Sequence, residues 1–264
     1  MWFAEPERFQ VDLLAAMVAK VTGAELHLAL APQAVWRPDD ADLAFRRAAD
    51  AALARFHVPT RDEPTFADLA RFHVPTRDEP TFADLARLLS TPAEARFGWL
   101  SDTTRGVNIS TLVAADQRFG VVAVRDGQEV SVRTFQRDRL SKVLADVLPQ
   151  DVRKSPEPSL TVLRSEVRGA RQAELNGTRP SRAVMRADYL ASLEPYFIAE
   201  LHAEVRDHTG QPRHPRFPLR VYDNAEGRWT VQAKPHYDDQ LLHFAPATAT
   251  DVADRLDELR RELN

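Results

Sequence analysis

The 264-residue sequence contains no cysteine, few glycines and no excess of positive charge. The absence of cysteine excludes a disulfide framework and a zinc site built on thiolates. The nine glycines form no phosphate-binding loop, which excludes the common dinucleotide and P-loop motifs. With 35 basic against 39 acidic residues, the composition gives no electrostatic support for nucleic-acid binding. We therefore expect no cofactor and no nucleic-acid partner.

Long apolar runs are also missing. No run approaches the roughly 20 residues that a transmembrane helix needs, and the first residues lack the basic and apolar regions of a signal peptide. Hydrophobic residues nevertheless make up 44% of the chain, which is enough for a sizeable core. We expect a cytoplasmic protein without a membrane span.

The sequence offers little that would support catalysis or metal binding. It has no Gly-x-Ser-x-Gly nucleophile elbow. His202, His208 and His214 lie around one predicted hairpin, but a metal site needs a further well-placed ligand, so solvated histidines are favoured. Glu200 and Glu204 share a strand face and could form an acid–base pair, although a solvated polar face explains them more simply. We expect neither catalytic residues nor metal ligands.

The clearest order in the chain lies between residues 195 and 263. Apolar and polar residues alternate in three segments, which predicts strands with one buried face. The alternating apolar residues are Phe197, Ala199, Leu201, Ala203 and Val205, then Phe217, Leu219 and Val221, then Trp229, Val231 and Ala233. A fourth strand is expected over 241–244, followed by a helix with Thr248 as N-cap and Asp251 three residues later. Trp99, Trp229, Phe217 and Phe244 are expected in the core.

A similar order occurs once earlier. Apolar alternation predicts strands near residues 97–99, 107–113, 119–123 and 130–134. A helix ending at Pro149 follows them. We therefore predict an α+β fold of two pseudo-symmetric halves, each an antiparallel β-meander closed by a helix, which form a central sheet flanked by helices. The proline-rich segment 150–158 marks the boundary, so the halves are residues 1–149 and 150–264.

A short exact repeat interrupts the first half. Residues 53–71 recur identically as residues 69–87, a tandem duplication with a period of 16 residues. This period is too short for the units of solenoid proteins. We expect the duplication in 53–87 to add an inserted helix and turn, which the fold tolerates because surface insertions cost little loop entropy.

Three segments carry a resemblance to a known family. They are Leu219–Trp229 (LRVYDNAEGRW), His243–Pro246 (HFAP) before the last helix, and Val121–Val130 (VVAVRDGQEV). In spacing and residue character they resemble the EspG family, the cytosolic chaperones associated with type VII (ESX) secretion in actinobacteria. The likeness extends from about Pro6 to Leu263.

The resemblance implies a non-enzymatic binding protein. Its partner would be a secreted helical client, typically a PE/PPE heterodimer, whose exposed apolar tip the chaperone keeps soluble before export. Two alternatives remain open. A small-molecule hydrolase or transferase on an α+β scaffold would show a deep pocket with convergent titratable groups. A structural or oligomerising protein would have no client.

We predict the partner-binding surface on the polar faces of two strands. Its residues are Glu200, His202 and Glu204 on one strand and Arg228, Thr230 and Gln232 on another. They alternate with apolar residues that must enter the core, so we expect their side chains to face solvent or a partner. The resemblance places the client's tip on the central sheet, together with helices near 181–193 and 252–263.

Overall fold

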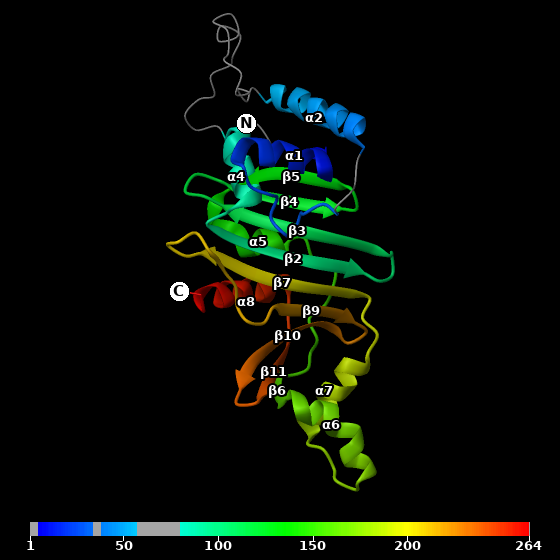
Figure 1. Ribbon diagram of the computed structural model, residues 1–264. Helices are drawn as coiled ribbons and strands as arrows, with labels where there is room; N and C mark the ends of the chain where they lie inside the picture. The colour runs from blue at the N-terminus through cyan, green and yellow to red at the C-terminus, as the bar shows by residue number, and fades with distance from the viewer. Residues whose placement is uncertain (1–4, 34–37, 57–79, 264) are drawn as a thin grey trace, which may run out of the picture. The chain divides into compact units, whose positions relative to one another are not determined.

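The computed structural model describes residues 5–33, 38–56 and 80–263 (Figure 1). These residues fall into two compact units that are interleaved along the chain. The first unit comprises Met1–Ala95, Ile109–Leu140 and Val205–Gln211, and the second comprises Arg96–Asn108, Ser141–Glu204 and Pro212–Asn264. The division of the chain into two pseudo-symmetric halves, residues 1–149 and 150–264, stays a prediction.

The first unit is a meander with helices packed against it. Its elements are β1 (Glu7–Gln10), α1 (Val11–Thr22), α2 (Asp39–Ala54), α4 (Phe82–Ser90), most of β3 (Val107–Ala115), β4 (Gly120–Asp126), β5 (Glu129–Phe135) and η1 (Arg137–Arg139). Helix α1 packs on α2 and α4 and buries Leu14 and Met17. Thr81 and Asp84 form a capping box that begins α4. This helix belongs to the second copy of the duplicated segment, whereas the predicted inserted helix and turn lie outside the described residues.

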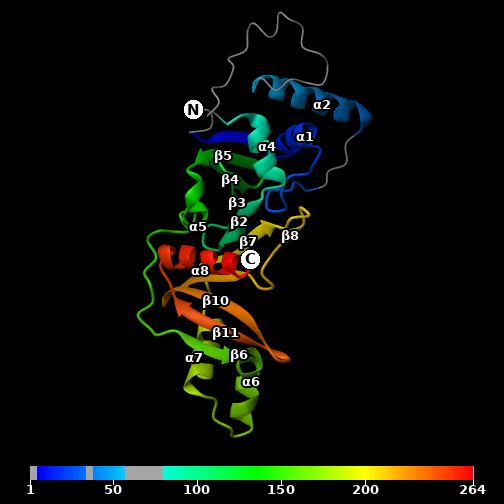
Figure 2. The same ribbon diagram turned by 90° about the vertical axis from the view of Figure 1, so that its left-hand side faces the viewer.

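The second unit contains the other predicted meander and two further helices. Its elements are most of β2 (Glu94–Asp102), α5 (Leu140–Ala145), β6 (Leu160–Leu163), α6 (Arg164–Leu175), α7 (Arg182–Ser192), most of β7 (Phe197–Arg206), β8 (Pro212–Arg213), β9 (Leu219–Asn224), β10 (Gly227–His236), β11 (Asp239–Pro246) and α8 (Ala249–Arg261). Figures 1 and 2 show α8 on one side of β9, β10 and β11, and α6 and α7 beside β6. The predicted capping box of Thr248 and Asp251 begins α8, which buries Val252, Leu256 and Leu259.

The strands pair in the order β1-β5-β4-β3-β2-β7-β9-β10-β11-β6, with β8 joined to β7. Among the described residues they form one eleven-stranded antiparallel sheet. The order of four strands and a helix therefore occurs twice along the chain, as the apolar alternation predicted. The predicted α+β class, an antiparallel sheet flanked by helices, is confirmed.

Candidate functional site

The strand pairing of the second unit assigns its side chains to two sheet faces. Trp229 on β10 lies opposite Tyr222 on β9. Val231 on β10 lies between Arg220 on β9 and Phe244 on β11. Directly paired residues of antiparallel strands point to the same side of the sheet. These five side chains therefore share one face, here called the pocket face.

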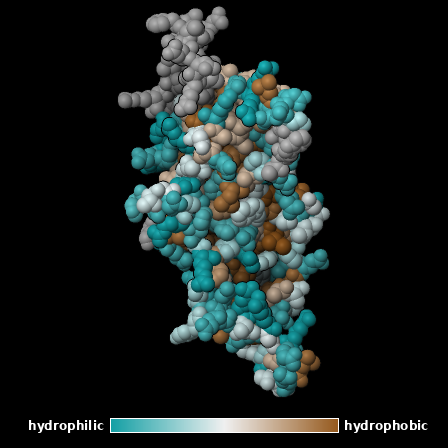
Figure 3. Space-filling model, in the orientation of Figure 1, coloured by the Kyte–Doolittle hydropathy of each residue, from teal (hydrophilic) through white to brown (hydrophobic). Residues whose placement is uncertain are grey.

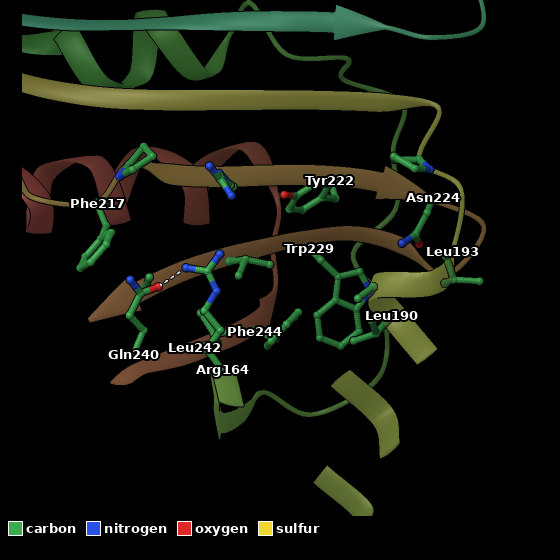
Figure 4. A pocket seen from close by; sticks show the side chains of 16 residues that line it. Arg164, Leu190, Leu193, Phe217, Tyr222, Asn224, Trp229, Gln240, Leu242 and Phe244 are labelled. Atoms are coloured by element: carbon green, nitrogen blue, oxygen red, sulfur yellow. Dashed lines mark hydrogen bonds between the residues drawn. The ribbon is translucent and has the colours of Figure 1, made fainter. Parts of the chain in front are cut away.

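A pocket of about 490 Å³ opens on this face (Figure 4). Strands β9, β10 and β11 form its floor, the C-terminal end of α7 forms one wall, and the start of α6 contributes another. Most of the lining is apolar, including Leu190, Leu193, Phe217, Trp229, Leu242 and Phe244. Figure 3, in the orientation of Figure 1, shows hydrophobic side chains gathered over the middle strands of this unit. Apolar surface that remains open in this way is typical of a binding site.

Helix α7 is held beside the pocket by a small core and by polar contacts. The core joins α6, α7 and β6 to the pocket face through Val162, Ala170, Val184, Ala187, Leu190, Trp229 and Phe244. Arg186 Nη2 lies 3.0 Å from Glu226 Oε2 in the β9–β10 turn, and Tyr189 Oη donates to Glu226 Oε1 at 3.1 Å. These bonds lower the pKa of the Glu226 carboxyl below its ordinary value. These contacts tie the β9–β10 turn to α7.

Arg164 and Trp229 are two of the side chains with polar groups that line the pocket. Arg164, the first residue of α6, donates from Nη1 to Gln240 Oε1 at 2.7 Å. Trp229 is only 2% exposed, and its indole Nε1 has no hydrogen-bond partner in the described part of the chain. A buried donor without an acceptor is uncommon, because it loses its bond to water and gains nothing in return.

An aromatic and histidine cluster lies in the same unit. The His202 ring stacks on Phe97 with centroids 4.9 Å apart, and Trp99 meets His202 edge-on at 5.4 Å. Burial lowers the pKa of the His202 imidazole, and the Glu200 carboxylate, 3.3 Å away, only partly opposes this effect. Trp99 remains 41% exposed, which contradicts its expected place in the core. The cluster thus presents an aromatic surface to solvent.

The lowered pKa of His202 predicts an acid-sensitive fold. Between the folded pKa and the unfolded value of about 6.5, the unfolded chain binds more protons, so stability is lost as the pH falls. Lowering the pH from about 7.5 to 5.5 should therefore reduce the free energy of unfolding. His202→Phe keeps a ring on Phe97 but cannot titrate. The free energy of unfolding of this variant should therefore fall less over the same pH range than that of the wild-type protein. His243 has a pKa lowered by burial as well, so part of the dependence should remain. Urea denaturation at both pH values tests this, and equal losses in both proteins would contradict it.

The pocket lining is poor in reactive groups. Its residues include two arginines, a tyrosine, an asparagine and a glutamine, but no carboxylate, imidazole, serine, threonine or lysine. No three His, Asp or Glu side chains of the described residues are grouped to hold a metal ion.

In the same part of the chain, no helix is long and apolar enough to cross a membrane.

The model of the EspG family matches residues 11–258. The chain belongs to the EspG family. No curated protein matches its sequence. Among solved structures, this EspG-family chain is similar to the type VII secretion system chaperone EspG5 of Mycobacterium tuberculosis, whose structure was determined in complex with the PE25–PPE41 dimer. The TM-score is 0.63 at 16% sequence identity, over 98% of this chain and 97% of that chain. The two proteins share a fold.

The predicted partner-binding residues of this EspG-family chain do not share one surface. Glu200 pairs with Arg220 across β7 and β9 and therefore lies on the pocket face, with His202 two residues further along the strand. Both are partly exposed. Glu204 is buried, with one carboxylate oxygen 3.8 Å from His214 Nε2. For Glu204 the expected solvent exposure was wrong.

The three residues predicted on β10 lie on the opposite face and are buried. Lys234 on that face reaches Glu262 just beyond α8, at 3.4 Å, so α8 covers this side of the strand. Thr230 donates to the Ala245 carbonyl at 3.1 Å. Arg228 and Gln232 are 1% and 7% exposed. The expectation that Arg228, Thr230 and Gln232 face solvent was wrong, because α8 covers the face on which they lie.

Proposed function

We propose that this EspG-family protein is a non-enzymatic cytoplasmic chaperone of type VII secretion. Its client is a PE/PPE-like helical heterodimer, which it holds soluble before export. The family membership supports this function, and the EspG5 structure supports it because a protein of the same fold was determined with the PE25–PPE41 dimer.

The observation that carries the proposal is the apolar pocket on an exposed sheet face. Its floor of Val231, Leu242 and Phe244 lies beside the wall formed by α7. An apolar side chain from a helical tip would be removed from water there, which favours association by about 25 cal/mol per Å² of apolar area buried. Such binding needs no nucleotide and no covalent step.

The client contacts are proposed at the pocket and at the neighbouring part of the same face. Glu200 and His202 lie on this face and retain their proposed role as partner-binding residues. Arg228, Thr230 and Gln232 support the floor of the pocket from its other side. The hydrolase or transferase alternative is not favoured, because Tyr222 is the only group suited to acid–base or nucleophilic catalysis among the described residues that line the pocket.

Filling the pocket should weaken client binding. The chain is co-expressed with each PE/PPE-like pair encoded in its own genome, and complexes are separated by size-exclusion chromatography. Ala233 lines the pocket, so Ala233→Trp should bind the client at least tenfold more weakly than the wild-type chain does, a loss of about 1.4 kcal/mol. Ala225 is exposed in the β9–β10 turn outside the pocket, so Ala225→Trp is the matched control and should bind normally.

Two outcomes would reject the proposal. If the wild-type chain forms a complex with none of the pairs, it is not a PE/PPE chaperone. If both tryptophan variants bind as tightly as wild type, the client binds at another surface. The melting temperatures of both variants confirm that each is folded.

A further inference from the structure

The charge of Arg164 is not balanced within the described part of the chain. Its guanidinium projects into the pocket, where Gln240 accepts one hydrogen bond at 2.7 Å (Figure 4). No carboxylate of the described residues lies within ion-pair distance of it. The other arginine of the pocket, Arg220, lies 3.1 Å from a Glu200 carboxylate oxygen. Arg164 is therefore the uncompensated cation of the pocket.

A partly buried guanidinium favours an anionic partner. It has five N–H donors in a planar fork that matches a carboxylate, and Gln240 occupies one of them. Gln240 also fixes the direction of the side chain, which reduces the entropy that a ligand would have to overcome. The site is thus preorganised for a carboxylate.

The indole of Trp229 supplies a second, independent donor. Nε1 is buried in the wall of the pocket and has no acceptor in the described part of the chain. In Figure 4 the Trp229 ring lies toward the end bounded by Leu190 and Leu193, whereas Arg164 lies toward the Gln240 end. An apolar floor that includes Val231 and Phe244 also lines the pocket.

We propose that the client segment seated in this pocket presents three matched groups. A carboxylate side chain pairs with Arg164, an apolar side chain covers the floor, and a carbonyl or amide oxygen accepts from Trp229 Nε1. The pocket therefore selects an acidic and apolar helical tip among secreted clients. This inference rests on the proposed function and adds the chemical feature that a client must carry.

Removing the cation tests the carboxylate. Arg164→Gln should weaken binding of the PE/PPE-like pair that co-elutes with the wild-type chain by about tenfold. Arg168 is exposed one turn further along α6, so Arg168→Gln changes the net charge equally without touching the pocket. This control should bind within about twofold of wild type. Calorimetric titration at low and moderate salt gives both affinities.

Removing the indole N–H of Trp229 tests the proposed hydrogen bond to a carbonyl or amide oxygen of the client. Trp229→Phe keeps an aromatic ring in the wall and should weaken binding about fivefold. In the free protein the same change removes a donor that has no partner but leaves a small cavity in the core, so the two effects oppose each other and the melting temperature should change by only a few degrees. A purely structural role of Trp229 would lower stability and binding together.

The outcomes separate this inference from the proposed function. If the wild-type chain binds no pair, the proposed function fails and the inference fails with it. If the wild-type chain binds, and Arg164→Gln and Trp229→Phe bind equally well, only the inference is overturned. Micromolar binding of octanoate to the wild-type chain, with client binding unchanged in Arg164→Gln, would assign the pocket to a free amphipathic carboxylate and also overturn it.

Discussion

Replacing Arg228 with alanine should destabilise the protein by about 3–5 kcal/mol, because it leaves a buried carboxylate without its counter-charge. Arg228 and Asp223 are 1% and 0% exposed at their side chains and form two hydrogen bonds of 2.7 Å. Arg228 Nη2 also donates to the Pro149 carbonyl at 2.7 Å. The melting temperature should fall by about 10 °C for a chain of this size.

Arg220 provides the matched control for Arg228. It pairs with Glu200 at 3.1 Å, but its side chain is 52% exposed. Arg220→Ala should therefore cost less than about 1 kcal/mol. The double change Arg228→Met with Asp223→Leu should recover much of the loss, because it removes both buried charges together. Equal melting temperatures for Arg228→Ala and Arg220→Ala would contradict this account.

Gly227→Ala in the β9–β10 hairpin should destabilise the protein by about 4 kcal/mol. The residue has a φ of +104°, which L-residues rarely adopt. A Cβ there would lie 2.6 Å from the Arg153 carbonyl oxygen and 3.0 Å from the Ser155 nitrogen, and neither backbone atom can rotate away. Strain and collision therefore act together.

Gly177 separates these two causes. It has a φ of +74°, and a Cβ there would meet no atom within 4 Å. Gly177→Ala should therefore cost only the conformational strain, about 1–2 kcal/mol. Chemical denaturation of the Gly227→Ala and Gly177→Ala variants gives the difference between their free energies of unfolding. If the two costs are equal, the close approach of the Arg153 backbone has no energetic consequence.

The secondary structure of the second meander could be predicted because the relevant information is local. Alternation from Phe197 to Val205 and around Trp229 follows from the two-residue period of a strand. The Thr248 capping box is likewise encoded in four consecutive residues. These patterns need no knowledge of what packs on the sheet.

Which face of each strand is covered by a helix and which is open to solvent could not be predicted in the same way. Alternation shows which residues of one strand share a side, but not which side a distant helix covers. Here α8 covers the polar residues of β10 and leaves Trp229 and Val231 in the pocket. A buried ion pair and a hydrogen-bonded threonine make this arrangement possible, because they satisfy polar groups that burial would otherwise penalise.

The turn between β9 and β10 held information that the prediction did not use. Asn224 pairs with Gly227, so even-numbered residues of β9 share a face with odd-numbered residues of β10. Glu200 pairs with Arg220, so even numbers stay together between β7 and β9. Grouping Glu200 with Arg228 therefore combined two opposite faces. A two-residue hairpin loop at Ala225 and Glu226 would have given the first relation from sequence.

We therefore expect the two faces of β10 to be under different selective pressures. Arg228 and Thr230 are constrained by the fold, because each makes a hydrogen bond in the interior. Val231 and Ala233 line the pocket, so they are constrained by the ligand proposed to bind there. Alternate positions along a single strand can thus diverge at different rates. Under the proposed function, changes at every second residue of this strand would alter the client while the architecture stays intact.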